Sequence, residues 1–286
     1  MSAKVYAVKT IDEALTCLQK ESVMVIAGGT NFLVDKKRGK YENKNLVSID
    51  GIDALKKVER KENGMYSIGS LVNFSRLETD WAKNQAYQGI KAAASMVGGP
   101  QIRNRGTIGG NLISASPAAD MVPALLVLDA SVKLKSKVWE RIIPLEGFMT
   151  APGKTLIEAD ELMTEILLPY RKGKSTFYKV GKRNALAISV INQAVYLEIE
   201  KGAIKKVSIA TGSVAPTAVR AHETEAYLRG KKPESHEWVN VLNKAASILM
   251  EEISPIDDIR ATKEYRKTLA RNLLVENLSC LTGRKN

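Results

Sequence analysis

Two glycine-rich segments in the first half of the chain combine glycine with small hydroxyl and amide side chains. The first is Ala27-Gly28-Gly29-Thr30-Asn31 and the second is Thr107-Ile108-Gly109-Gly110-Asn111. Glycine lets a backbone approach a ligand closely and turn so that several N–H groups converge, which suits phosphate. A single segment of this kind is most often a strand-ending turn. Two in one small domain indicate a ligand with an extended anionic linker, such as a dinucleotide.

Neither segment matches the common nucleotide-binding loops. A Rossmann fingerprint needs G-x-G-x-x-G between a strand and a helix, and the sequence has neither this pattern nor a Walker loop. A dinucleotide would therefore be bound by another scaffold.

A carboxylate follows the second segment, at the end of Ser116-Pro117-Ala118-Ala119-Asp120. Asp120 directly precedes an apolar stretch that predicts a buried helix, so its side chain could cap that helix. It could equally accept hydrogen bonds from a ribityl or ribose hydroxyl. The residues alone leave both interpretations open.

The first half mixes helices and strands irregularly. Thr10-Ile11-Asp12-Glu13 predicts a capping box and a helix start, and Val23 to Ala27 predicts a short buried strand that runs into the first glycine segment. Asn63-Gly64 predicts a hairpin turn between 56–61 and 65–68. Further strands are expected at 46–49, 130–134 and 162–168, and helices at 86–97, stopped by Gly98-Gly99-Pro100, and at 121–128.

The basic stretch 171–174 predicts a domain boundary. This gives a first domain over 1–174, with parts at about 1–55 and 56–174, and a second over 175–286. The second domain should hold strands at 175–181, 188–200 and 203–211, then helices at 221–229, 235–252 and 261–281. The order of elements indicates an α+β fold. The last helix is amphipathic, with an apolar face of Leu269, Leu273, Leu274 and Leu278 and a polar face of Lys263, Arg266, Lys267 and Arg271.

Composition excludes several classes of function. The net charge is +12, but the lysines lie in short scattered groups with few aromatic residues among them, which argues against nucleic-acid binding. No apolar run approaches the ~20 residues of a membrane span, and the N-terminus has no signal-peptide pattern. Cys17 and Cys280 form neither a disulfide framework nor a metal-ligand spacing, so no metal site is expected and a reducing cytoplasm is the simplest location.

Taken in order, these motifs resemble the FAD-binding (medium) subunit of the molybdenum hydroxylases, the xanthine dehydrogenase and carbon monoxide dehydrogenase family. The resemblance covers essentially the whole chain. It is carried by both glycine segments, by Gln101-Ile102-Arg103-Asn104, by 116–120 and by the later segments Leu162-Met163-Thr164-Glu165-Ile166, Tyr178-Lys179-Val180-Gly181-Lys182-Arg183 and Tyr265-Arg266-Lys267-Thr268-Leu269-Ala270.

The resemblance implies a fold and a set of ligand contacts. The fold would be a two-part FAD-binding domain of the vanillyl-alcohol-oxidase (PCMH) type, followed by a C-terminal α+β domain with a three-stranded antiparallel sheet and helices. Backbone N–H groups of the two glycine segments would hold the FAD pyrophosphate, and the Asp120 carboxylate would bind the ribityl chain. Backbone groups near Leu162 and Met163 would meet the polar edge of the isoalloxazine.

Lys179 would lie near the flavin ring by the same resemblance, whereas the residues alone favour a surface lysine on an alternating strand. No catalytic residue is identified with certainty. Some relatives place an aromatic residue over the flavin in the stretch aligned with Asn184-Ala185-Leu186-Ala187, and this chain has none there. Either an aliphatic side chain covers that face, or the ring is more open to a pyridine nucleotide.

The implied activity is electron relay in an oxidoreductase, from iron–sulfur clusters through FAD to NAD+ or another acceptor. Two cysteines cannot supply the four thiolates of a [2Fe–2S] cluster, so a small iron–sulfur subunit and a large molybdopterin subunit are expected as partners.

Purine-type oxidation is the leading reaction of the whole complex by resemblance, followed by oxidation of aromatic N-heterocycles, aldehydes and carbon monoxide. The alternatives are a stand-alone FAD-dependent reductase of the same fold and a non-catalytic assembly module.

Overall fold

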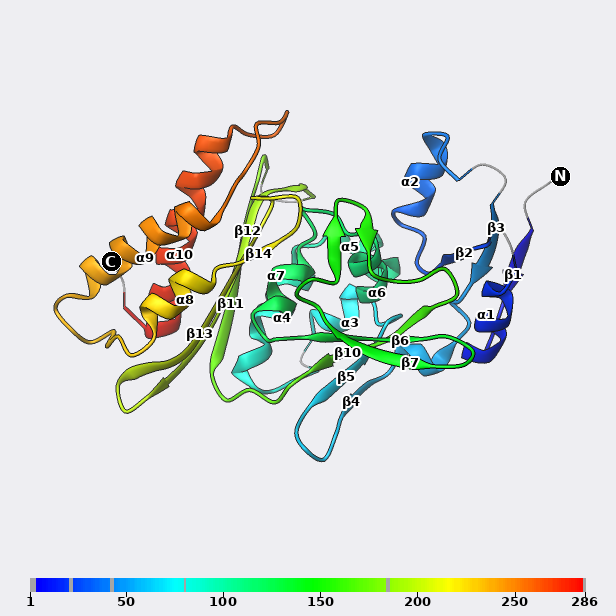
Figure 1. The fold of residues 1–286 in the computed structure, drawn as a ribbon, viewed down its shortest axis with the longest axis horizontal. Helices are drawn as coiled ribbons and strands as arrows, with labels where there is room; N and C mark the ends of the chain where they lie inside the picture. The colour runs from blue at the N-terminus through cyan, green and yellow to red at the C-terminus, as the bar shows by residue number, and fades with distance from the viewer. Residues whose placement is uncertain (1–3, 21–22, 42–43, 80, 184–185, 285–286) are drawn as a thin grey trace.

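A computed structural model describes residues 4–20, 23–41, 44–79, 81–183 and 186–284. Three sheets follow one another along the long axis of the molecule, with the N-terminal sheet at one end and the C-terminal helices at the other (Figure 1). The α+β class predicted from the element order is confirmed.

The N-terminal sheet is small and parallel, in the order β1 (Val5–Ala7), β3 (Asn45–Ser48), β2 (Val23–Ile26). Helix α1 (Ile11–Leu18) begins with the predicted capping box: Thr10 Oγ1 accepts from the Glu13 amide, and the Glu13 carboxylate accepts from the Thr10 amide. The helix packs its apolar face on this sheet. Strand β2 ends directly before the first glycine segment, and helix α2 (Phe32–Lys37) follows that segment.

The central sheet is antiparallel, in the order β4-β5-β10-β6-β7. The Asn63-Gly64 turn joins β4 to β5 as predicted, with Gly64 at φ +80°. Strand β10 has the predicted bounds, Leu162–Leu168. The other bounds are β4 Val58–Arg60, β5 Tyr66–Gly69, β6 Ser131–Lys135 and β7 Glu140–Pro144, with a separate hairpin of β8 (Met149–Ala151) and β9 (Lys154–Thr155).

Helices pack on the central sheet and differ in several places from the expectation. The helix predicted at 86–97 is a 3-10 turn (Gln85–Tyr87) followed by α4 (Gln88–Ser95). Pro100 then starts α5 (Pro100–Arg105), because proline is well tolerated at a first helical position. The second glycine segment is a helix start and not a loop: α6 spans Ile108–Ile113. Helices α3 (Phe74–Leu77) and α7 (Met121–Leu126) complete this layer.

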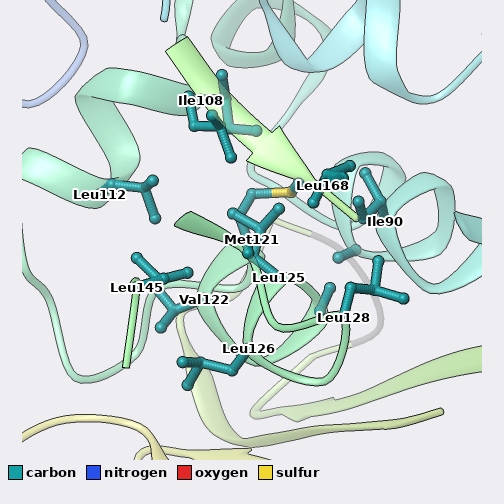
Figure 2. Close-up of a cluster of buried hydrophobic side chains, with 14 of the residues drawn as sticks. Ile90, Ile108, Leu112, Met121, Val122, Leu125, Leu126, Leu128, Leu145 and Leu168 are labelled. Carbon is teal, nitrogen blue, oxygen red and sulfur yellow. The ribbon is translucent and has the colours of Figure 1, made fainter. Parts of the chain in front are cut away.

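The largest hydrophobic core lies between these helices and the central sheet. Figure 2 shows Met121, Val122 and Leu125 of α7 converging with Ile108 and Leu112 of α6. Residue 120 therefore directly precedes a fully buried helix, which fixes the position of its backbone.

The C-terminal sheet has the order β11 (Lys174–Gly181), β12 (Ser189–Glu200), β13 (Ala203–Gly212), β14 (Val219–Arg220). Its three long strands are those predicted, and the two-residue β14 is an addition at the edge. Helices α8 (His222–Leu228), α9 (Trp238–Glu252) and α10 (Lys263–Thr282) cover one face of this sheet (Figure 1).

One residue of the predicted polar face of α10 is placed differently. Arg266 is only 3% exposed, and its guanidinium donates to the carbonyl oxygens of Val190 and Ser213, each at 2.8 Å. The expectation of a solvated arginine is wrong because acceptors from two distant strands meet this helix face.

In the part of the chain that the structure describes, no helix has both the length and the apolar character to cross a membrane.

Candidate functional site

The two glycine segments lie against each other. An ideal Cβ atom on Gly28 would lie 1.7 Å from the carbonyl oxygen of Arg105, at the end of α5, so only glycine permits this approach. Asn31 Nδ2 also donates to Ser114 Oγ, just after α6, at 3.1 Å. Segments about eighty residues apart in the sequence thus form one surface.

The first segment presents unsatisfied backbone donors. The amides of Gly28 through Phe32 donate to no protein acceptor within the described residues. Gly29 has φ +74°, a left-handed conformation that turns the chain between β2 and α2 and that glycine adopts without strain. Backbone N–H groups clustered at such a turn form a site for an anion.

The second segment contributes the first turn of α6. Thr107 caps it by accepting from the Gly110 amide at 3.1 Å. Gly109 faces inward, because a Cβ atom there would lie 2.7 Å from Ser70 Cβ and 2.8 Å from the Ser70 carbonyl oxygen. The absence of a side chain at Gly109 therefore serves close packing against Ser70. Asn111 Oδ1 is buried and has no partner among the described residues, so it can accept from a ligand donor.

Asp120 and Lys179 are brought together, although the sequence separates them by 59 positions. Lys179 Nζ donates to Asp120 Oδ2 at 2.5 Å and to the carbonyl oxygen of Met96 at 2.9 Å. Ser189 Oγ and Asn192 Nδ2 donate to the other carboxylate oxygen, Oδ1, at 2.6 and 2.8 Å. The site thus joins α7, β11 and β12.

This geometry decides between the interpretations of both residues. The Asp120 side chain forms no capping hydrogen bond to α7, so the capping interpretation is wrong. The Lys179 side chain is 8% exposed, so it is not a surface lysine. A carboxylate has about four acceptor positions, and three donors reach Asp120, which leaves one position for a ligand hydroxyl.

Leu162 and Met163 begin β10 and are both 3% exposed. They pair with Lys135 and Leu134 of β6, whereas the pairing of β10 with β5 begins only at Glu165. The backbone at Leu162 and Met163 therefore has strand pairing on one edge only, which leaves the other edge for a different partner.

The stretch that lacks an aromatic residue falls partly outside the described residues, at Asn184 and Ala185. Leu186 is described: it has φ +57°, and its Cδ2 lies 2.7 Å from the position of a Cβ atom on Gly99, at the start of α5. An aliphatic side chain thus lies in this region, 57% exposed.

An open cavity of about 400 Å³ lies elsewhere, between α4 and the outer edge of β11. Neither glycine segment, nor Asp120, nor Lys179 lines it. The candidate site is therefore defined by the convergence of polar groups and not by this cavity.

Comparison with known protein families identifies both parts of the chain. Residues 1–171 match the model described as FAD binding domain in molybdopterin dehydrogenase, and residues 176–281 match CO dehydrogenase flavoprotein C-terminal domain. The chain belongs to the FAD-binding subunits of the molybdenum hydroxylase family.

Individual members of this family align over most of their length. The xanthine dehydrogenase FAD-binding subunit of Escherichia coli O157:H7 is 27% identical, with 99% of this chain and 98% of that protein covered. The nicotinate dehydrogenase FAD-subunit of Eubacterium barkeri is 37% identical over 70% of each chain. A solved carbon monoxide dehydrogenase from Hydrogenophaga pseudoflava superimposes with a TM-score of 0.91 at 26% identity, covering 100% of this chain and 99% of that one.

The residues present fit the flavin dinucleotide that this FAD-binding family implies. The free amides at 28–32 suit the pyrophosphate, and the open acceptor position on Asp120 suits a ribityl hydroxyl. The orphaned Asn111 Oδ1 is a further acceptor on the same surface.

Sequence patterns did not identify Ser189, Asn192 and Met96 as parts of this candidate site. A signal for Asn192 existed, because Asn192-Gln193 interrupts an otherwise apolar strand. Strand alternation places Asn192 and Gln193 on opposite faces of the sheet, but nothing in the sequence indicates that Asp120 is the partner of Asn192.

Proposed function

We propose that the chain is the FAD-carrying electron-transfer subunit of a heteromeric, xanthine dehydrogenase-like molybdenum hydroxylase. The observation that most supports this proposal is in the first glycine segment, which lies against the second. There the backbone amides of residues 28–32 have no acceptor among the described residues. This surface offers an extended anion several donors at once, and membership of the FAD-binding family supplies the ligand class.

Each site residue has a proposed role. The segments Ala27 to Asn31 and Thr107 to Asn111 bind the pyrophosphate. Asp120 accepts from the ribityl chain, the backbone of Leu162 and Met163 meets the polar edge of the ring, and Lys179 lies beside the ring while its charge is balanced by Asp120.

Bound FAD supplies hydride and single-electron transfer, and this chain's residues bind it, orient it and set the charge around it. Electrons would arrive from a [2Fe–2S] cluster on a small partner subunit, because the two cysteines here cannot hold one. A large molybdopterin subunit would oxidise the substrate. NAD+ is the proposed acceptor.

Purine-type oxidation is the proposed reaction of the whole complex. The relatives are named for xanthine, nicotinate and carbon monoxide, although they share this type of subunit. Such variety is expected if the partner subunit that holds molybdopterin selects the substrate.

The test is the visible absorption spectrum of the purified full-length chain, with the heat-released cofactor identified by chromatography. One FAD per chain is the expected result, and anaerobic NADH should then bleach the flavin absorbance. A chain that takes up no FAD would overturn the proposal. A flavin that NADH leaves oxidised would overturn NAD+ as the acceptor while leaving the electron-relay role in place.

A further inference from the structure

Asp120 is held in place from the C-terminal sheet. Ser189 and Asn192, at the start of β12, both donate to Asp120 Oδ1, and Asn192 Nδ2 also lies 3.3 Å from Ser189 Oγ. Ser189 is 1% exposed and Asn192 is 0% exposed. Since buried donors cannot exchange the carboxylate for water, these bonds restrict Asp120 to one rotamer.

The loop that carries Asp120 is fixed at a second point. The Ser213 amide, directly after β13, donates to the carbonyl oxygen of Pro117 at 2.8 Å. The segment 116–120 is therefore bound to the ends of two neighbouring strands, at its backbone and at its carboxylate. The position of the carboxylate depends on the C-terminal sheet as much as on α7.

A glycine opposite Asn192 makes this arrangement possible. Gly212 pairs with Asn192 across β12 and β13, and a Cβ atom on Gly212 would lie 2.2 Å from Asn192 Oδ1. Any side chain at 212 would displace the amide that reaches Asp120. Asn192 Oδ1 has no hydrogen-bond partner among the described residues, so the amide is retained at the cost of an unsatisfied buried oxygen.

We propose that Ser189 and Asn192 are positioning residues for the flavin site and that Gly212 makes room for them. With Oδ1 occupied from β12, Asp120 presents its remaining acceptor position on the side of Lys179, where the ribityl chain would pass. This inference rests on the proposed function, because it assigns the two residues to the FAD site.

The experiment compares two neighbours on β12 that face opposite sides of the sheet. Asn192→Leu removes the donor to Asp120 and keeps the number of side-chain non-hydrogen atoms. Gln193→Leu is the matched control, because Gln193 is equally buried but bonds Thr211 and the carbonyl oxygen of Ala270. FAD affinity is measured by titration of the FAD-free full-length chains, and stability by urea unfolding without FAD.

We expect Asn192→Leu to weaken FAD binding about tenfold, which is the usual effect of losing one hydrogen bond to a charged group. We expect Gln193→Leu to change FAD affinity by less than about twofold. Both variants should lower stability, so stability alone does not separate them. When Asp120→Asn is already present, adding Asn192→Leu should weaken FAD binding by less than about twofold, because the carboxylate to which Asn192 donates has been removed.

Equal losses of FAD affinity in Asn192→Leu and Gln193→Leu would overturn the inference, as would an undiminished effect of Asn192→Leu in the Asp120→Asn background. If Asn192→Leu does not fold, Ser189→Ala replaces it, since it deletes a single hydroxyl and should weaken FAD binding several-fold. A wild-type chain that binds no FAD would instead overturn the proposed function itself.

Discussion

Lys179 Nζ lies 2.5 Å from Asp120 Oδ2, and each side chain is 8% exposed. Their mutual attraction stabilises two charges that are largely removed from water, and the ammonium group donates a second hydrogen bond to the Met96 carbonyl oxygen. Each residue thus supplies the counter-charge of the other in the folded chain, before any ligand is considered.

Replacing Lys179 by methionine should therefore destabilise the FAD-free chain. The buried Asp120 carboxylate would lose its counter-charge, and breaking a buried pair costs about 3–5 kcal/mol. Adding Asp120→Asn should restore part of that loss, because the stranded charge disappears. Urea unfolding of the two single variants and the double variant measures this coupling. Strictly additive losses would show that the pair does not interact as the geometry requires.

The first glycine segment allows a test in which backbone strain is matched. Gly29 and Gly202 have φ +74° and +77°, and an alanine Cβ atom would have no close contact at either position. Alanine at each should cost about 1–2 kcal/mol of stability from the left-handed conformation. Only Gly29→Ala should also weaken FAD binding, because the free amides lie beside it.

Gly28→Ala should lower stability more than Gly29→Ala or Gly202→Ala. Its Cβ atom would overlap the Arg105 carbonyl oxygen, so the two glycine segments would have to separate. We expect both lower stability and loss of FAD retention, measured by urea unfolding and flavin content. Unchanged flavin content in Gly28→Ala would contradict a site shared by the two segments.

The junction between α7 and the C-terminal sheet contains two carboxylates, which should contribute differently to the stability of the folded chain. Arg220 forms an ion pair with Glu225, whose side chain is 7% exposed, and another with Asp129, whose side chain is 38% exposed. Glu225→Gln should cost about 3 kcal/mol because it removes the buried counter-charge of the Arg220 guanidinium and leaves only the more exposed Asp129. Asp129→Asn should cost less, because water screens the partly exposed carboxylate, although Asp129 also pairs with Arg171 and Lys206. Thermal or urea unfolding that ranks the two in the opposite order would contradict this assignment.

Local sequence signals predicted the elements whose causes are local. The capping box at Thr10, the Asn63-Gly64 hairpin and the apolar run of β10 all formed as expected. The start of α6 was missed because its glycines indicate a turn, although Thr107 provides a local N-cap and Gly109 packs closely against Ser70.

Contacts between distant segments, both in the fold and in the candidate site, could not be predicted from local sequence patterns. Arg266 and Asn192 are polar residues on elements whose local pattern gives no partner, and their acceptors come from distant segments. The resemblance to a family supplied Asp120 and Lys179 as site residues, but only the structure shows that they bind each other.

The loop before α10 should make stability depend on pH in the acid range. The pKa of Asp258 is lowered to about 2: partial burial opposes ionisation, but the amides of Arg260 and Ala261 and the Arg266 guanidinium outweigh it. A carboxyl with a depressed pKa stabilises the folded state above its unfolded pKa, near 4, and this contribution disappears as pH falls toward the folded pKa. Asp258→Asn should therefore be less stable than wild type at pH 5, and the difference should shrink steadily between about pH 4 and pH 2. Urea unfolding of both chains across this range measures the difference, and a gap that stays constant with pH would show that the Asp258 charge does not stabilise the loop.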